Sequence, residues 1–154
     1  MLLKLMPDQV SRYWDLFKEA ILETVPPIPN ESPETLNNML AALLAEGAQA
    51  WVSFRKEDNV NKVHGFIVTS IVYDPITNTR SLYIQSIYVP ENNSIEQDWI
   101  EGMMALRKFA IANNCNRVLG HTKNKRLIEF AAKFGGNTDY VLCSWPLIPP
   151  EGML

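Results

Sequence analysis

A strand–loop–helix stretch in the second half of the chain constrains the fold most strongly. Residues 81–89 are rich in β-branched and aromatic side chains, which predicts a long strand. The polar loop Pro90–Ser94 follows, and Ser94-Ile95-Glu96-Gln97 is a capping box that starts a helix running to about Ala112. A helix N-terminus placed after such a loop presents free backbone N–H groups, which suit an anion. The loop contains no glycine, although glycine is the residue that lets a phosphate approach the backbone closely.

Length, charge and cysteine content limit the classes of protein. The 154 residues are 47% hydrophobic and 20% charged, which predicts a single domain over residues 1–154. A net charge of -3 predicts no nucleic-acid partner, and no apolar run approaches the roughly 20 residues that span a bilayer. Cys115 and Cys143 have neither disulfide-scaffold nor metal-ligand spacing, and the N-terminal apolar run is too short for a secretory signal. We therefore expect a cytoplasmic protein with no membrane partner and no metal site.

The spacing of apolar residues predicts the remaining elements. Helices are expected over residues 8–23, 33–46, 95–112 and 125–134, and strands over residues 1–6, 50–56, 63–73, 81–89, 117–121 and 139–147. A polar turn is expected at residues 57–62, and a hairpin turn at residues 74–79. The two long strands in the middle are apolar on both faces, so helices should cover both sides of the sheet. The order predicts an α+β fold with a mixed, mostly antiparallel central sheet and helices on both faces.

This order of elements, with Tyr88-Val89-Pro90 before a helix and Asn124 followed later by Phe134-Gly135, resembles the GNAT acyltransferases. The resemblance covers the chain from about Leu3 to Leu147. In that family a central strand splays from its neighbour, and the pantetheine arm of acyl-CoA lies between them. The resemblance implies that residues 81–89 and 117–121 form these two strands, with acetyl-CoA or another acyl-CoA as co-substrate.

The resemblance also implies where the cofactor would lie. Backbone groups near Ile87 and Val89 would bind the pantetheine amides, and the loop at residues 92–95 would face the pyrophosphate. The cofactor-binding candidates are Ile87, Val89, Asn93, Ser94, Ile95, Asn124 and Lys125. Ser94 fits a helix cap better than a ligand, since the capping box explains both Ser94 and Gln97, whereas Asn124 fits a cap or a cofactor contact equally well, and Lys125 fits a solvated surface.

Two positions depart from the family pattern. The family's loop usually carries Arg or Gln and then two glycines, whereas this chain has residues 93–96 there, among acidic residues. Repulsion from those residues would oppose a helix-end attraction of only about 0.3–1 kcal/mol. Many members also carry a tyrosine, as general acid, four residues before the glycine that ends the last helix. Here that position is Ala131, with Phe130 beside it.

Polar side chains near the expected splay are candidates for the reaction centre. Gln85 would need a partner if it were buried, which fits a substrate ligand or a hydrogen bond to a neighbouring loop. Tyr88 and Tyr140 are phenols that can replace the absent acid. His64 fits a base or a satisfied strand histidine, and His121 lies where the two strands would part. Alternation along the strand puts Tyr83, Gln85 and Ile87 on one face and Ser86 and Tyr88 on the other.

Three interpretations follow from the sequence. The first is an acyl-CoA-dependent N-acyltransferase that transfers an acetyl group directly to a small-molecule or peptide amine. The second is a catalytically inactive GNAT-fold binding or assembly module, which the glycine-free loop and the missing tyrosine favour. The third is an unrelated α+β domain with the same order of elements. The apolar C-terminal residues 147–150 also suggest contact with a second subunit in a homodimer.

Overall fold

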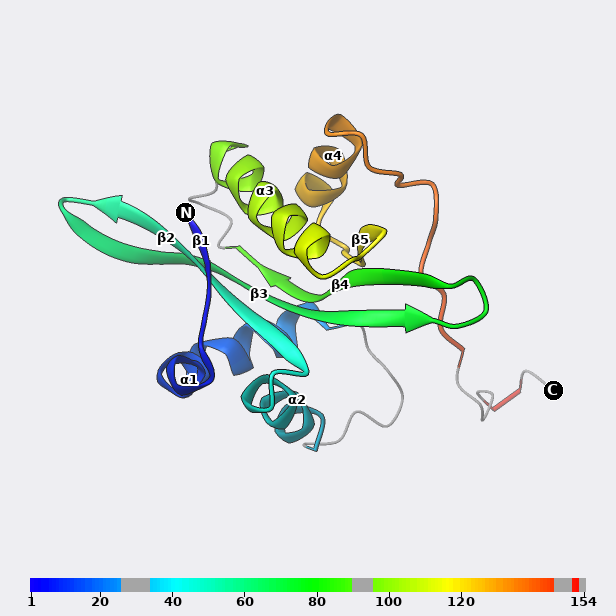
Figure 1. Cartoon of the computed structure of the whole chain (residues 1–154), viewed down its shortest axis with the longest axis horizontal. Helices are drawn as coiled ribbons and strands as arrows, with labels where there is room; N and C mark the ends of the chain where they lie inside the picture. Colours follow the sequence, from blue (N-terminus) through cyan, green and yellow to red (C-terminus); the bar gives the residue numbers. More distant parts are fainter. Residues whose placement is uncertain (26–33, 90–95, 146–150, 153–154) are drawn as a thin grey trace.

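A twisted five-stranded sheet lies between two layers of helices (Figure 1). The computed structural model describes residues 1–25, 34–89, 96–145 and 151–152. The elements in chain order are β1 (Leu2–Lys4), α1 (Pro7–Thr24), α2 (Glu34–Leu44), β2 (Ala48–Glu57), β3 (Val60–Asp74), β4 (Thr79–Tyr88), α3 (Glu96–Ala112), β5 (Arg117–Gly120) and α4 (Lys125–Lys133). Strands β1 to β4 are antiparallel neighbours, whereas β5 runs parallel to β4. The predicted α+β class, with its mixed sheet and helices on both faces, is confirmed.

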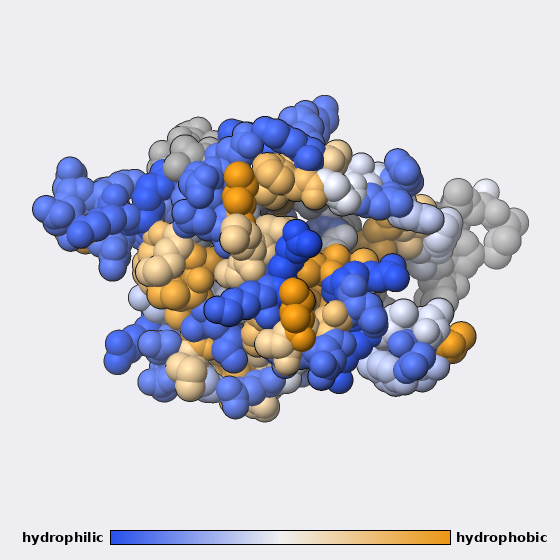
Figure 2. Space-filling model, turned by 45° about the horizontal axis from the view of Figure 1, so that its top comes forward, coloured by the Kyte–Doolittle hydropathy of each residue, from blue (hydrophilic) through white to orange (hydrophobic). Residues whose placement is uncertain are grey.

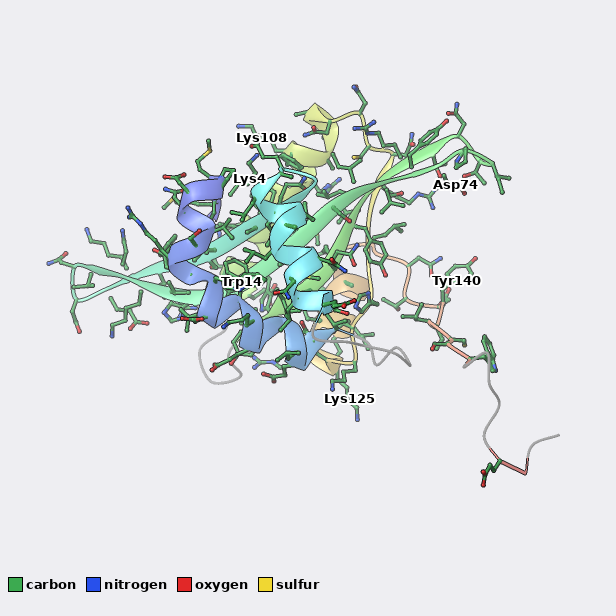
Figure 3. The ribbon with its side chains drawn as sticks, turned by 90° about the horizontal axis from the view of Figure 1, so that it is seen from below. Lys4, Trp14, Asp74, Lys108, Lys125 and Tyr140 are labelled. Atoms are coloured by element: carbon green, nitrogen blue, oxygen red, sulfur yellow. The ribbon has the colours of Figure 1, made fainter. Side chains whose placement is uncertain are left out.

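Helices α1 and α2 cover one face of the sheet (Figures 1 and 3). Val10, Phe17 and Ile21 lie on one stripe of α1 and are buried against β2 and β3. The ring centroid of Phe17 lies 4.6 Å from that of Phe66 on β3, and Phe17 has no exposed surface. Within the described ranges no helix is long and apolar enough to cross a membrane.

Helix α3 covers the other face. Its residues Leu106 and Ala110 pack with Trp51 and Leu82 of the sheet. The indole Nε1 of Trp51 donates a hydrogen bond of 2.9 Å to Thr69 Oγ1, so the buried polar atom of this cluster has a partner. Burial on both faces explains why the middle strands read as continuous apolar runs.

The turn between β2 and β3 is shorter than predicted. Pairing continues to Glu57 and Val60, so only Asp58 and Asn59 form the turn. Both have left-handed backbone, with φ of 50° and 63°, as a tight two-residue hairpin requires. The prediction of a turn over residues 57–62 was therefore wrong, because Asn and Asp adopt left-handed backbone readily and allowed the strands to extend.

The predicted last strand is not a strand in this structure. Residues 139–145, which we call the trailing segment, follow α4 without joining the sheet (Figure 1). Apolar alternation gives a segment the capacity to pair, but a strand also needs a partner edge with which to exchange backbone hydrogen bonds. Residues 146 and 147 of the predicted strand lie outside the described residues, as do Ser32 and Pro33 of the predicted helix start and residues 148–150.

Replacement of Phe17 by alanine should destabilise the protein by about 3–5 kcal/mol, because it removes a buried ring and leaves a cavity under α1. Leu16→Ala is the matched control, since Leu16 is 48% exposed on the same helix. Urea unfolding of both variants measures the effect. A Phe17→Ala protein as stable as Leu16→Ala would contradict this packing.

Candidate functional site

Strands β4 and β5 pair over only part of their length. Ser81–Ile84 of β4 faces Arg117–Gly120 of β5, and β4 then continues to Tyr88 without a partner on this side among the described residues. We call the opening between residues 85–88 of β4 and His121, the residue after β5, the wedge. The parting of two adjacent strands that the sequence implied is therefore present.

A β-bulge at Gln85 accounts for this parting. In the pairing of β3 with β4, Val68 faces Ser86 and Thr69 faces Ile84, which leaves Gln85 as an extra residue on β4. An extra residue bends its strand and increases the local twist. The bulge lies immediately after Ile84, the last residue of β4 that pairs with β5. It thus turns β4 away from β5 at the point where the wedge begins.

The bulge also changes which side chains share a face. Gln85 Nε2 donates to Ser70 Oγ at 2.9 Å, and Ser86 Oγ lies 2.5 Å from Thr24 Oγ1 of α1. Ile87 instead packs in the cluster beneath α3. The prediction that Ile87 shares a face with Gln85 was wrong, because the inserted residue shifts the alternation by one.

A large cavity of about 1100 Å³ opens at the wedge. Ile87 and Tyr88 of β4 line it together with Val89, the next residue, and His121, the residue after β5, lines it from the other side. Its other walls come from α3, α4 and residues 136–142, with Phe130 and Phe134 among the apolar side chains. In Figure 2 apolar residues lie in the middle of the visible face, interspersed with hydrophilic ones. This cavity is an apolar cleft with unpaired strand backbone on one wall.

His121 and Tyr83 form a polar pair beside the wedge. Tyr83 Oη lies 2.8 Å from His121 Nδ1, and burial lowers the pKa of His121 below its usual value. The ring is therefore mainly neutral at pH 7. The other nitrogen, Nε2, makes no hydrogen bond to any described residue, and His121 lines the cavity. The resemblance placed His121 at the opening, but nothing in the sequence indicated that Tyr83 pairs with it. The two residues are 38 positions apart in the chain, and only the pairing of β4 with β5 brings them together.

Two ion pairs offset the acidic character of the start of α3. Glu96 Oε1 lies 2.7 Å from Lys133 Nζ of α4, and the Asp98 carboxylate pairs with the Arg55 guanidinium of β2. The sequence contains no basic residue between Arg80 and Arg107 that could pair with Glu96 or Asp98 from a nearby position. The tertiary structure supplies the compensating charges from a distant strand and helix.

The predicted site residues that the structure describes fall into three groups. Ile87, Tyr88, Val89 and Tyr140 line the cavity, although Tyr140 is 87% exposed on the trailing segment, away from the helices (Figure 3). Asn124 caps α4, because its side chain accepts a hydrogen bond of 3.0 Å from Arg126 N, and Lys125 begins that helix in an exposed position. Gln85 is held by Ser70.

Three of the cofactor candidates, Asn93, Ser94 and Ile95, lie outside the described residues. The position expected for a general acid, Ala131, lines the cavity together with Phe130, so this part of the wall offers no titratable side chain.

No family model and no curated protein matches this sequence. Solved structures do match. A probable acetyltransferase superposes with a TM-score of 0.67 at 13% identity, covering 98% of this chain and 99% of that one. A predicted acetyltransferase from Clostridium acetobutylicum, solved with acetyl-CoA, gives a TM-score of 0.64 at 16% identity, with 94% and 95% covered. The chain has the GNAT fold. An aminoglycoside N-acetyltransferase in complex with CoA also shares it, with a TM-score of 0.64 at 11% identity and 95% and 98% covered.

The ring of His121 should titrate below the usual histidine pKa of about 6.5. An NMR titration of its ring protons measures this, with the resonance assigned by its loss in His121→Gln. Because the unfolded chain binds the proton at a higher pH than the folded one, this residue's contribution to stability is complete above pH 6.5 or so and is lost as the pH falls further. A midpoint at or above that of the urea-unfolded chain would contradict the burial of this ring.

Proposed function

We propose that this protein is an acyl-CoA-dependent N-acyltransferase that transfers an acetyl group directly from acetyl-CoA to an amine. The observation that carries this proposal is the wedge, where unpaired backbone of β4 lines a cavity of about 1100 Å³. An unpaired strand edge offers N–H and C=O groups in a row, which match the amides of an extended pantetheine arm. Structural neighbours with acetyl-CoA or CoA support the same donor.

The electrostatics at the start of α3 are compatible with a pyrophosphate. The helix N-terminus favours an anion, and the pairing of Glu96 with Lys133 and of Asp98 with Arg55 reduces the repulsion expected from sequence. Lys123, which also lines the cavity, adds positive charge on the neighbouring loop. The loop at residues 93–95 would face the same group.

The transfer would proceed in one displacement. A neutral amine attacks the thioester carbonyl, a C–N bond forms as the C–S bond breaks, and CoA leaves as the thiolate. The backbone N–H near Val89 polarises the carbonyl, and positioning in the wedge supplies much of the rate. Tyr88 or water then protonates the thiolate, since Ala131 cannot.

We assign the acceptor of the ammonium proton to His121. Its ring is mainly neutral at pH 7 because burial lowers its pKa. The proposal requires the tautomer in which Nδ1–H donates to Tyr83 Oη, 2.8 Å away, since this leaves Nε2 as the basic nitrogen of a ring that lines the cavity. Tyr83 then acts as a positioning residue that fixes the ring and its tautomer.

The second candidate is a GNAT-fold binding module without catalysis. Ala131 and Phe130 in place of a proton donor, together with Gln85 bonded to Ser70, favour it. The two candidates differ in thiol release, which only the enzyme produces.

Val89→Pro should weaken acetyl-CoA binding about 2- to 12-fold, because it removes one backbone N–H, and a hydrogen bond is worth roughly 0.5–1.5 kcal/mol. Val89 follows the last paired residue of β4, so its N–H is not needed for the pairing with β3. Val89→Ala is the matched control, since it shortens the side chain and keeps the N–H. Calorimetry measures both affinities. Absence of binding by the unmodified protein at millimolar acetyl-CoA would overturn the proposed function.

His121→Ala should lower kcat by about 10²–10⁴, the usual contribution of a general base, while acetyl-CoA affinity stays unchanged. The assay is release of free CoA thiol with a panel of primary amines. Tyr83→Phe should show a smaller loss and a shifted pH profile. Equal activity of His121→Ala and the unmodified protein would remove His121 from the reaction but leave the acyltransferase proposal standing.

A further inference from the structure

The part of the cavity between α3 and α4 is apolar and begins at the wedge. Helices α3 and α4 lie on the same side of the sheet (Figure 1). The ring centroids of Trp99 on α3 and Phe130 on α4 are 5.7 Å apart, so the two helices share an aromatic wall. We call this part the apolar channel, and the side chains that form it are Ile87, Trp99, Met103, Leu127, Phe130 and Ala131. None of these side chains carries a charge.

Helix α4 turns an apolar face toward this channel. Leu127, Phe130 and Ala131, with Phe134 at the helix end, follow the spacing of one helix face, and all four line the cavity. Leu127, Phe130 and Ala131 are half-buried, and α4 buries no residue completely. A short helix is normally stabilised by packing of its apolar face against a core. Among the described residues this cover is incomplete, which leaves the face accessible to an apolar ligand.

Small residues keep the channel open. Ala131 contributes only a methyl group, and Gly135 and Gly136, which also line the cavity, contribute no side chain. Gly136 N donates to the Ala131 carbonyl at 2.8 Å, and a Cβ at Gly136 would lie 2.8 Å from the same oxygen, so a larger residue does not fit there. The cavity volume of about 1100 Å³ is at the upper end of the roughly 300–1,000 Å³ typical of small-molecule sites. An acetyl group would leave most of the channel empty.

The position of His121 indicates which reactant enters the channel. The amine must lie within hydrogen-bond reach of His121, which lines the wedge on the side of β5. The acyl chain continues from a carbonyl held near Val89, and the side left to it is that of Ile87, which packs beneath α3. Apolar walls favour a hydrocarbon chain, whereas a chain ending in a carboxylate would lose hydration there without gaining a partner.

We propose that the apolar channel binds the acyl chain of the donor, and that straight-chain acyl-CoAs longer than acetyl-CoA are bound more tightly than acetyl-CoA. This inference rests on the proposed function, because the chain reaches the channel only when its thioester lies in the wedge. The transfer step is unchanged. The acyl carbon bonds to the amine nitrogen, its bond to sulfur breaks with the electron pair going to sulfur, and the ammonium proton passes to His121.

Calorimetry with acetyl-, butyryl- and hexanoyl-CoA tests this in the unmodified protein. Burial of one methylene raises affinity by up to about fourfold, so butyryl-CoA, with two more, should bind about 3- to 15-fold tighter than acetyl-CoA, and hexanoyl-CoA tighter still. Binding of acetyl-CoA with no gain for the longer donors would overturn the channel and leave the acyltransferase proposal standing. Absence of binding by all three donors would contradict the proposed function and this inference with it.

Ala131→Leu narrows the channel, and Ala132→Leu is the matched control, because Ala132 is exposed on the same helix. The ratio of hexanoyl-CoA to acetyl-CoA affinity should fall at least about 10-fold in Ala131→Leu, since two or more methylenes lose their space, and should not change in Ala132→Leu. An unchanged ratio in Ala131→Leu would contradict the proposal. Should that variant lose affinity for every donor, Ala131→Val, with a smaller side chain, gives the same comparison.

A series of straight-chain primary amines distinguishes the acyl chain from the amine as occupant of the channel. With acetyl-CoA as donor, the release of CoA thiol should give similar KM values for short and long amines, both in the unmodified protein and in Ala131→Leu. A KM that falls with amine length in the unmodified protein but not in Ala131→Leu would show that the channel holds the acceptor, and would overturn the proposal.

Discussion

The extra residue at Gln85 is the constraint on which the geometry of the site depends. Its insertion interrupts the regular pairing of β4 with β3 at one residue. It also bends β4 immediately after Ile84, the last residue of β4 that pairs with β5. Two consequences follow from this single irregularity. Backbone groups beyond Ile84 have no partner on the β5 side among the described residues, and Ile87 moves to the face beneath α3. His121, the residue after β5, lines the opening from the other side. Bulges are common at sites where a strand must redirect a side chain or stop pairing, and here both occur together.

The molecule is packed unevenly about this point. Helices α1 and α2 bury a full apolar stripe against β2 and β3, so that half is a well-filled core. Helix α4 has no buried residue, and it meets α3 through a ring contact between Trp99 and Phe130 and an exposed ion pair between Lys133 and Glu96. An exposed ion pair is worth at most about 1 kcal/mol, so the pair of Lys133 and Glu96 adds little to the stability of the contact between α4 and α3. The cavity is large because α4, unlike α1 and α2, buries no residue on its side of the sheet.

Charge and proton chemistry at the wedge come from residues that are distant in sequence. Arg55 of β2 and Lys133 of α4 pair with carboxylates in the first turn of α3, which reduces the repulsion that these carboxylates would exert on an anion. Tyr83 and His121 form a pair because parallel strands bring their positions together, and burial keeps the imidazole neutral. Together these contacts place a mainly neutral imidazole beside the wedge and cations beside the carboxylates of α3, while Ala131 lines the cavity without a titratable group.

The sequence by itself determined the α+β class and most element positions, because apolar periodicity and capping residues act locally. The location of the opening, with Ile87 and Val89 beside it, came from the resemblance to the GNAT acyltransferases, and Tyr88 was a candidate because it is a phenol near the expected splay. The bulge at Gln85, the pairing of His121 with Tyr83 and the ion pairs of Glu96 and Asp98 were decided only by tertiary structure, since each depends on register between strands or on contacts between distant elements. The trailing segment illustrates the limit most clearly. Its alternation gave it the capacity to form a strand, but a strand forms only where backbone hydrogen bonds to an edge are made, and residues 139–145 make none to a strand in the described structure.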